Sequence, residues 1–105
     1  MSHNNKSIKA AVLIDRLANN ESLNLLDVRE NIEYFTRNIG GLNIPVGQLA
    51  ERLEDLEWRA EDEIIVVCSK GIRSRTAQSI LQQNGYQNVV NLEGGLLAIE
   101  KHQSI

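Results

Sequence analysis

The sequence predicts a three-layer α/β domain, in which a mostly parallel sheet has helices on both faces. Short apolar segments typical of strands alternate with segments of helical periodicity. The most apolar of these segments, Glu63–Val67, has no polar positions after its first residue, as expected for a central strand with both faces covered. No linker, repeat or low-complexity tract interrupts this order, so we expect residues 1–105 to form a single domain.

The first half of the chain contains one clear helical pattern and several short elements. Apolar residues at helical spacing predict an amphipathic helix over residues 10–18, which Asn19-Asn20 ends. The segments that follow are a strand at 23–28, a helical turn at 32–35, a strand at 42–44 stopped by Pro45, and a helix with the apolar face Val46, Leu49, Ala50, Leu53 and Leu56. We expect Trp58, in the polar stretch beyond, to cover the core.

The second half of the chain continues the same alternation. After the central strand, a helix from about Arg73 to Asn84 is expected, with Gly85 just past its end. The segments beyond it are a strand at 88–92, a turn at Gly94-Gly95 and a last short helix at 96–101. In parallel sheets the functional crevice lies at the carboxyl ends of the strands, which is where Cys68 falls.

The only cysteine, Cys68, stands where the apolar strand breaks into a short polar loop that leads into a helix. Backbone amides and a helix N-terminus gather around such a loop and favour an anion. We therefore expect Cys68 to be a reactive thiolate with a lowered pKa. The alternative is a small buried hydrophobic residue at a strand end, which is how most free cysteines are used. Any group that Cys68 acquires must pass to an external acceptor, because the chain has no second thiol.

Loop amides are expected to activate this cysteine, rather than a histidine. The two histidines, His3 and His102, lie close to the chain ends and far from Cys68 in sequence. Lowering a thiol pKa from ~8.5 to roughly 6.5 requires about 2.7 kcal/mol in favour of the charged form. A helix dipole supplies ~0.3–1 kcal/mol at an exposed site, whereas each hydrogen bond to a charged group contributes ~1.5–3 kcal/mol.

Composition and charge exclude several classes of function. The formal net charge is −3 and the basic residues are spread along the chain, which disfavours nucleic acid as a partner. No apolar run approaches a membrane span and the first residues lack a signal-peptide profile, so we expect a cytoplasmic protein without membrane association. The sequence has no recognisable zinc spacing and no glycine-rich nucleotide motif, so neither a metal nor a cofactor is expected.

Four groups of residues, in this order and spacing, resemble the rhodanese family of single-domain sulfurtransferases from about Ile8 to Lys101. They are Leu26-Asp27-Val28-Arg29-Glu30 with Glu33-Tyr34, Asn43-Ile44-Pro45, the loop Cys68–Ser74, and Gly94-Gly95 before the last helix. The resemblance implies a rhodanese-like sandwich with a five-stranded sheet. It also implies that Cys68 takes a sulfane sulfur as a persulfide from a donor such as thiosulfate or a protein persulfide. The acceptor would be thiophilic: cyanide, a thiol or a sulfur-carrier protein.

The loop after Cys68 is the expected substrate site; its residues are Ser69, Lys70, Gly71, Ile72, Arg73 and Ser74. Lys70 and Arg73 provide two cations for an anionic donor, even though Ser69 stands where many family members carry a basic residue. Gly71 permits a tight turn or a close approach of substrate, and Ser74 either caps the helix or hydrogen-bonds the sulfur. Asp27 and Arg29 are expected to form a supporting ion pair at the rim of the crevice.

Two other functions compete with sulfur transfer. Phosphatases and arsenate reductases of similar fold also use a loop cysteine and an arginine, but they resemble His-Cys, five residues and Arg. Here Val67 precedes Cys68 and only residues 69–72 separate it from Arg73, so the ring of amides is smaller and suits a single sulfur atom. The other alternative is a non-catalytic docking or regulatory module, which would not need a thiolate among loop amides.

Overall fold

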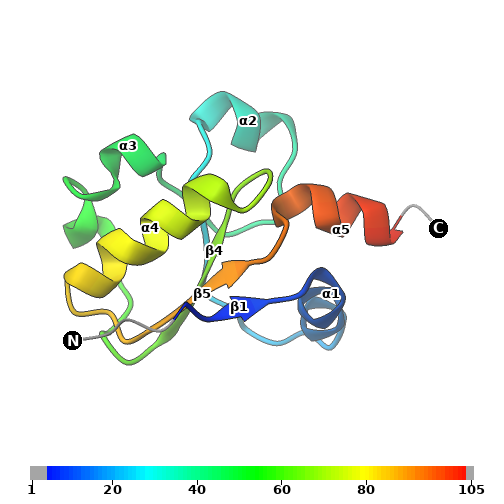
Figure 1. Ribbon diagram of the computed structural model, residues 1–105, viewed down its shortest axis with the longest axis horizontal. Helices are drawn as coiled ribbons and strands as arrows, with labels where there is room; N and C mark the ends of the chain where they lie inside the picture. Colours follow the sequence, from blue (N-terminus) through cyan, green and yellow to red (C-terminus); the bar gives the residue numbers. More distant parts are fainter. Residues whose placement is uncertain (1–4, 104–105) are drawn as a thin grey trace.

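The computed structural model describes residues 5–103, an α/β domain built on one sheet (Figure 1). The strands of this sheet are parallel and lie in the order β1-β5-β4-β2-β3. The strands are β1 (Ser7–Ile8), β2 (Leu25–Asp27), β3 (Leu42–Asn43), β4 (Glu63–Val67) and β5 (Asn88–Leu92). The helices are α1 (Ala10–Ala18), α2 (Asn31–Thr36), α3 (Val46–Leu49), the 3-10 turn η1 (Leu53–Asp55), α4 (Ile72–Gln83) and α5 (Gly95–Gln103). Among the described residues, no helix is both long and apolar enough to cross a membrane.

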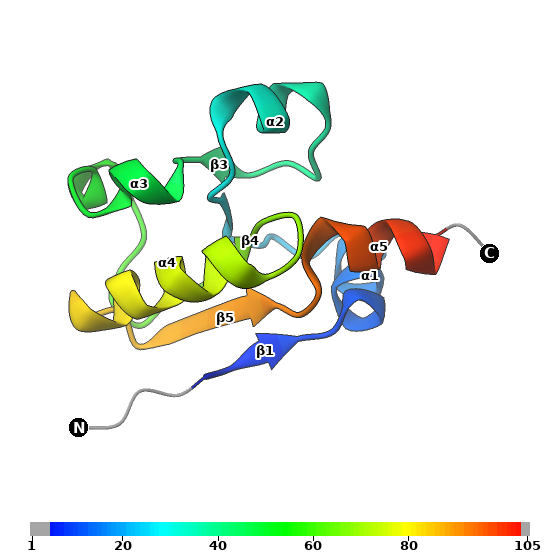
Figure 2. The ribbon, with the colours of Figure 1, turned by 45° about the horizontal axis from the view of Figure 1, so that its top comes forward.

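Helices cover both faces of the sheet, as the sequence predicts (Figures 1 and 2). Helices α3 and α4 bury Leu49 and Leu81 against one face, and α1 and α5 bury Leu13 and Ile99 against the other. The central strand β4 contributes alternate residues to the two apolar clusters. This alternation places Cys68, the residue after β4, on the face that α3 and α4 cover.

Most of the predicted elements are confirmed. Helix α1 and strands β4 and β5 have the predicted bounds, and α4 begins and ends one residue earlier than expected. Gly85 has a φ of +94° just past the end of α4, which is the backbone conformation that favours glycine there. Trp58 is half-buried and packs against the cluster under α3 and α4.

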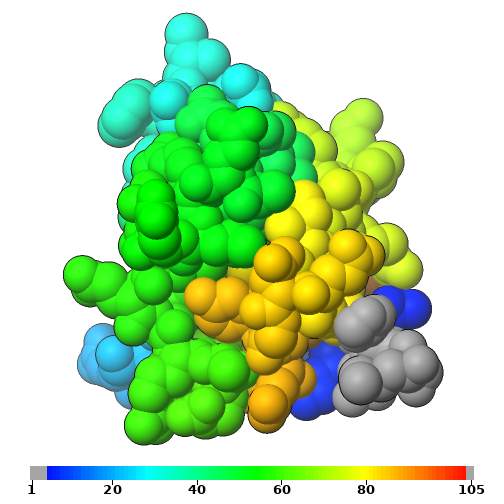
Figure 3. Space-filling view, turned by 90° about the vertical axis from the view of Figure 1, so that its left-hand side faces the viewer, coloured from blue at the N-terminus to red at the C-terminus, as the bar shows by residue number. Residues whose placement is uncertain are grey.

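The prediction of one helix with an apolar face from Val46 to Leu56 is wrong. The chain forms the four-residue α3 and then η1, because the amides bond to carbonyls three residues back, as in Arg52 N to Leu49 O at 3.0 Å. This tighter winding turns Ala50 to solvent while Leu49 and Leu56 remain buried. The segment still packs on α4, as the green and yellow surfaces in Figure 3 show.

The parallel strands all end at the same edge of the sheet, and the loop between β4 and α4 lies at this edge. Helix α2 lies above the loop and α5 begins beside it (Figure 2). The backbone bond from Val28 N to Val67 O, 2.9 Å long, joins the ends of β2 and β4 there. Segments far apart in the sequence therefore meet around Cys68.

Candidate active site

Cys68 lies at the bottom of a cavity at the carboxyl end of β4. The residue is 1% exposed, and it lines a cavity of about 440 Å³. The other residues that line this cavity are Ser69, Lys70, Ile72 and Arg73. Cys68 and four residues of the predicted loop therefore line one cavity, which opens onto the sulfur.

Two backbone amides point at the sulfur atom. The Gly71 amide donates to Cys68 Sγ at 3.1 Å and the Ser74 amide at 3.3 Å, while Ser74 Oγ lies 3.2 Å from the same sulfur. Burial opposes ionisation, but hydrogen bonds from the backbone amides of Ser74, Gly71 and Lys70 favour the charged form, and the pKa of Cys68 is lowered. Gly71 reaches this geometry with a φ of +95°, which other residues rarely adopt.

The pair Gly94-Gly95, at the start of α5, lets the first turn of that helix hydrogen-bond to the backbone of the loop. The amides of Leu96 and Leu97 donate to the carbonyl oxygens of Cys68 and Ser69 at 2.9 and 3.0 Å. A Cβ atom on Gly95 would lie 2.4 Å from the carbonyl carbon of Ser69, so only glycine fits. The sequence analysis treated this pair as a turn; the structure adds that it permits this close backbone approach.

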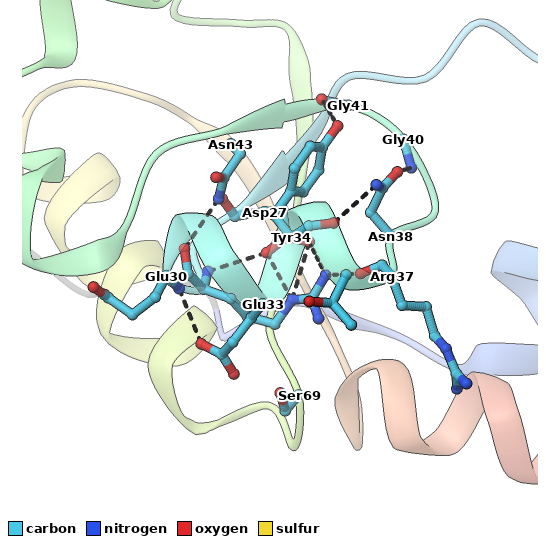
Figure 4. A network of polar contacts seen from close by, with 12 residues as sticks. Asp27, Glu30, Glu33, Tyr34, Arg37, Asn38, Gly40, Gly41, Asn43 and Ser69 are labelled. Atoms are coloured by element: carbon cyan, nitrogen blue, oxygen red, sulfur yellow. Dashed lines mark hydrogen bonds and ion pairs between the residues drawn. The ribbon is translucent and has the colours of Figure 1, made fainter.

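Arg73 is held by a carboxylate that the sequence analysis did not assign to the site. Its Nη1 and Nη2 atoms lie 2.6 and 3.0 Å from Glu33 Oε1 and Oε2, and Nη2 also donates to Ser69 Oγ at 3.2 Å. The bond from Arg73 is the main reason why the pKa of Glu33 falls to about 2. The Glu30 amide also donates to Glu33, at 3.0 Å (Figure 4). The start of α4 is thereby tied to α2.

The other loop cation and the neighbouring apolar residue are open to solvent. The Lys70 ammonium makes no hydrogen bond or ion pair with any residue in the range 5–103, and it lines the cavity over Cys68. Ile72 is 72% exposed and lines the same cavity. Lys70 is therefore the loop cation that is available to an anionic ligand.

Asp27 and Arg29 form a buried ion pair beneath α2. Arg29 Nη2 lies 2.7 Å from Asp27 Oδ2 and donates to the carbonyl oxygen of Arg37 at the same distance. The side-chain amide of Asn43 donates hydrogen bonds to the carbonyl oxygens of Asp27 and Arg29. Figure 4 shows Asn43 beside Asp27. Neither Asp27 nor Arg29 lines the cavity over Cys68, so their contacts position the β2–α2 connection and not a ligand.

Among residues 5–103, no histidine takes part in the contacts of Cys68. His102 is exposed on α5, and His3 lies outside the described residues. The bonds to Cys68 come from its own loop and the start of α4. Within residues 5–103, no group of His, Cys, Asp or Glu side chains is arranged to hold a metal ion.

Three residues of the site were missed by the sequence analysis: Glu33, Asn91 and Gly95. Asn91 is 3% exposed in β5 and accepts a hydrogen bond from the Ser74 hydroxyl. Its signal in the sequence is a polar residue inside the apolar run Val89-Val90-Asn91-Leu92. The signal for Gly95 is a glycine pair before a helix, and Glu33 has no local signal beyond the resemblance.

This arrangement defines a class of proteins: parallel α/β domains with a cysteine among loop amides at the end of the central strand. The family model of the rhodanese-like domain matches residues 9–102, and the chain belongs to this family. A sulfurtransferase from Allochromatium vinosum is 31% identical over 90% of this chain and 88% of its own length. A rhodanese-related protein from Thermoplasma volcanium has a TM-score of 0.76 and 31% identity, with 92% of each chain covered.

One similar protein is considerably longer than this chain. It is named "Putative sulfur carrier protein YrkF", comes from Bacillus subtilis (strain 168), and is 37% identical over 82 residues. The match spans 77% of this chain but 43% of that protein. The segment similar to this chain therefore makes up less than half of that protein.

Proposed function

We propose that this protein is a sulfurtransferase that carries a sulfane sulfur on Cys68 as a persulfide. The Cys68 thiolate attacks the outer sulfur of a donor such as thiosulfate and forms a new S–S bond. The donor's own S–S bond breaks, and its electron pair leaves with sulfite. A thiophilic acceptor then attacks the outer sulfur of the persulfide, and the bonding electron pair returns to Cys68 as the thiolate.

The observation that carries this proposal is the pair of amides directed at the sulfur. The Gly71 and Ser74 amides lie 3.1 and 3.3 Å from Cys68 Sγ and favour a negative charge on it. The same charge is needed in both steps, because Cys68 attacks as a thiolate and is released as one. A module used only for docking has no need of this geometry, whereas a nucleophile and leaving group does.

The surroundings of the cavity support an anionic donor and a protein or thiol acceptor. The Lys70 ammonium, free of partners among residues 5–103, can attract the sulfonate end of thiosulfate. Ile32 and Phe35 on α2 and Ile72 on α4 are all more than 70% exposed on the two elements that frame the loop. Exposed apolar side chains beside a reactive group are typical of contacts with another macromolecule. The relative named a sulfur carrier agrees with an acceptor of this kind.

The test is to detect the proposed intermediate directly. The protein is incubated with thiosulfate, freed of excess donor, and measured by intact mass spectrometry under non-reducing conditions. We expect a gain of one sulfur atom, lost again on addition of cyanide with release of thiocyanate. The matched control is Cys68→Ser, which should gain nothing. A sulfur adduct that forms equally on the Cys68→Ser protein, or no adduct with thiosulfate or with a persulfide donor, would contradict the proposal.

A further inference from the structure

A buried asparagine in β5 is connected to the reactive sulfur through one hydroxyl group. Asn91 lies on the α4 side of the sheet, is 3% exposed, and accepts a short hydrogen bond at Oδ1 from Ser74 Oγ. Its Nδ2 atom donates to the carbonyl oxygen of Gly71, 3.4 Å away. Ser74 Oγ in turn lies 3.2 Å from Cys68 Sγ. A chain of contacts therefore runs from Gly71 through Asn91 and Ser74 to Cys68.

The orientation of the Asn91 amide is fixed by its neighbours. A backbone carbonyl only accepts hydrogen bonds, so the group that faces Gly71 O must be Nδ2, and Oδ1 must face Ser74. A serine hydroxyl has one hydrogen, and Ser74 donates it to Asn91. Ser74 Oγ therefore offers the sulfur a lone pair, which suits a protonated Cys68 that donates to it.

Ionisation of Cys68 changes what the sulfur needs from Ser74. A thiolate accepts hydrogen bonds, and the amides of Gly71 and Ser74 donate to it in any case. The Ser74 hydroxyl can donate to the thiolate only if it leaves Asn91. Asn91 cannot compensate by turning its amide over, because Oδ1 would then face the Gly71 carbonyl oxygen. Asn91 and the thiolate thus compete for one proton.

We propose that Asn91 is a positioning residue that withholds the Ser74 hydroxyl from the Cys68 thiolate. This inference rests on the proposed function, because it explains how Asn91 would assist sulfur transfer. A thiolate that is less stabilised is a stronger nucleophile, which suits the attack on the donor.

The test measures the ionisation of Cys68 in an Asn91→Leu variant. Leucine has the same branching and number of side-chain heavy atoms as asparagine but accepts no hydrogen bond. The rate of alkylation by iodoacetamide is followed against pH. We expect the midpoint to fall by about one pH unit, which is about tenfold in acid dissociation. An unchanged or higher midpoint, including one raised by a loosened loop, would overturn the proposal.

A double-mutant cycle identifies Ser74 as the intermediary. Ser74→Ala alone should leave the alkylation midpoint within about half a unit of the natural value, because the hydroxyl is committed to Asn91 and does not donate to the thiolate. In the Ser74→Ala protein, Asn91→Leu should have no further effect. A rise of a full unit in Ser74→Ala alone would overturn the proposal even if Asn91→Leu failed to fold, since it would show that the hydroxyl already serves the thiolate.

The charged groups around the sulfur are the same in all these variants. On the elements that meet at this edge of the sheet they are Lys70 in the loop, Arg73 on α4, Glu33 on α2, the pair Asp27–Arg29 at the end of β2, and Glu93 after β5. Asn91 is neutral, so a shift of the alkylation midpoint in Asn91→Leu reports the loss of its hydrogen bond with Ser74 and not a change of charge. Alkylation does not require sulfur transfer, so loss of persulfide formation would contradict the proposed function while leaving this test valid.

Discussion

The two terminal nitrogens of Arg73 face the two carboxylate oxygens of Glu33, at 2.6 and 3.0 Å. Both side chains are about one third exposed, at 34% each. The sequence analysis expected Arg73 to bind the anionic end of a donor, but its forked donor group is already matched by a forked acceptor. This pairing favours a role in which Arg73 holds α2 and the loop together.

Arg73→Ala should therefore impair transfer from different donors to a similar extent. We expect kcat/KM to fall about tenfold, which corresponds to ~1.4 kcal/mol, with both thiosulfate and an uncharged persulfide donor. Glu33→Gln should reproduce most of this loss, because it removes the partner and not the cation. Steady-state kinetics with the two donors measure this. A loss confined to thiosulfate, with Glu33→Gln unaffected, would return Arg73 to the role of donor binding.

The ion pair also gives a dependence of stability on pH. The pKa of Glu33 is lowered from 4.5 to about 2, mainly by its bond to Arg73. Because the folded pKa is lower than the unfolded one, the stabilisation is fully present above about pH 4.5 and is lost as pH falls towards 2. Urea unfolding of the natural protein and of Glu33→Gln should differ at pH 7, and the difference should shrink below about pH 4.5 and vanish only below about pH 2. A constant difference across this range would contradict the ion pair.

Lys70 is the expected electrostatic contact for an anionic donor. Lys70→Ala should raise KM for thiosulfate about two- to fivefold, since an exposed charge contributes little and is screened by salt. The effect should shrink in high salt and should be absent for an uncharged persulfide donor. Lys101→Ala, at an exposed lysine in the last turn of α5, is the matched control. Equal effects of the two variants would assign the change to net charge alone.

Gly95 should be required for activity because of space, in addition to its φ of +65°, which already disfavours other residues. A Cβ at this position would meet Ser69 backbone atoms at 2.4 Å, so Gly95→Ala must displace the loop. We expect transfer to fall roughly 10²-fold, as for a displacement of about 1 Å in a reacting group. Gly85→Ala is the control: its φ of +94° is similarly unfavourable, but nothing lies within 4 Å.

The two glycine variants separate strain from steric overlap. Gly85→Ala should cost about 1–2 kcal/mol of unfolding free energy and leave transfer unchanged. Thermal unfolding and kinetics on both proteins provide the comparison. If Gly95→Ala lost stability but kept its activity, the contact between α5 and the loop would not position Cys68.

Local patterns in the sequence predicted the elements but only part of the site. The run Glu63–Val67 and the helical spacing of residues 10–18 are continuous signals, and both elements have the predicted bounds. The two-residue β1 has too few residues for a periodic signal. In the candidate site, Cys68 and its loop are contiguous in the sequence and could be predicted together, whereas Glu33 and Asn91 reach the loop from other elements. Their roles depend on tertiary contacts that no local spacing reveals.

The size of the loop is expected to decide between sulfur transfer and phosphate hydrolysis. Residues 69–72 separate Cys68 from Arg73, and the amides of Gly71 and Ser74 both converge on Sγ. Amides that donate to the sulfur itself are not directed at the positions that the oxygens of a bound phosphoryl group would occupy. The natural protein should transfer sulfur and show negligible hydrolysis of an aryl phosphate.

Insertion of one glycine beside Gly71 should widen this ring of amides. Because donors must point to the position where charge develops, we expect sulfur transfer to fall roughly 10²-fold and aryl phosphate hydrolysis to become detectable. Insertion of one glycine beside Gly40, in the connection between α2 and β3, controls for lengthening of the chain. Assays of thiocyanate formation and of aryl phosphate hydrolysis on the three proteins measure the two activities. Appreciable phosphatase activity in the natural protein, with no persulfide on Cys68, would reverse the assignment, because the smaller ring would then already accept a tetrahedral oxyanion.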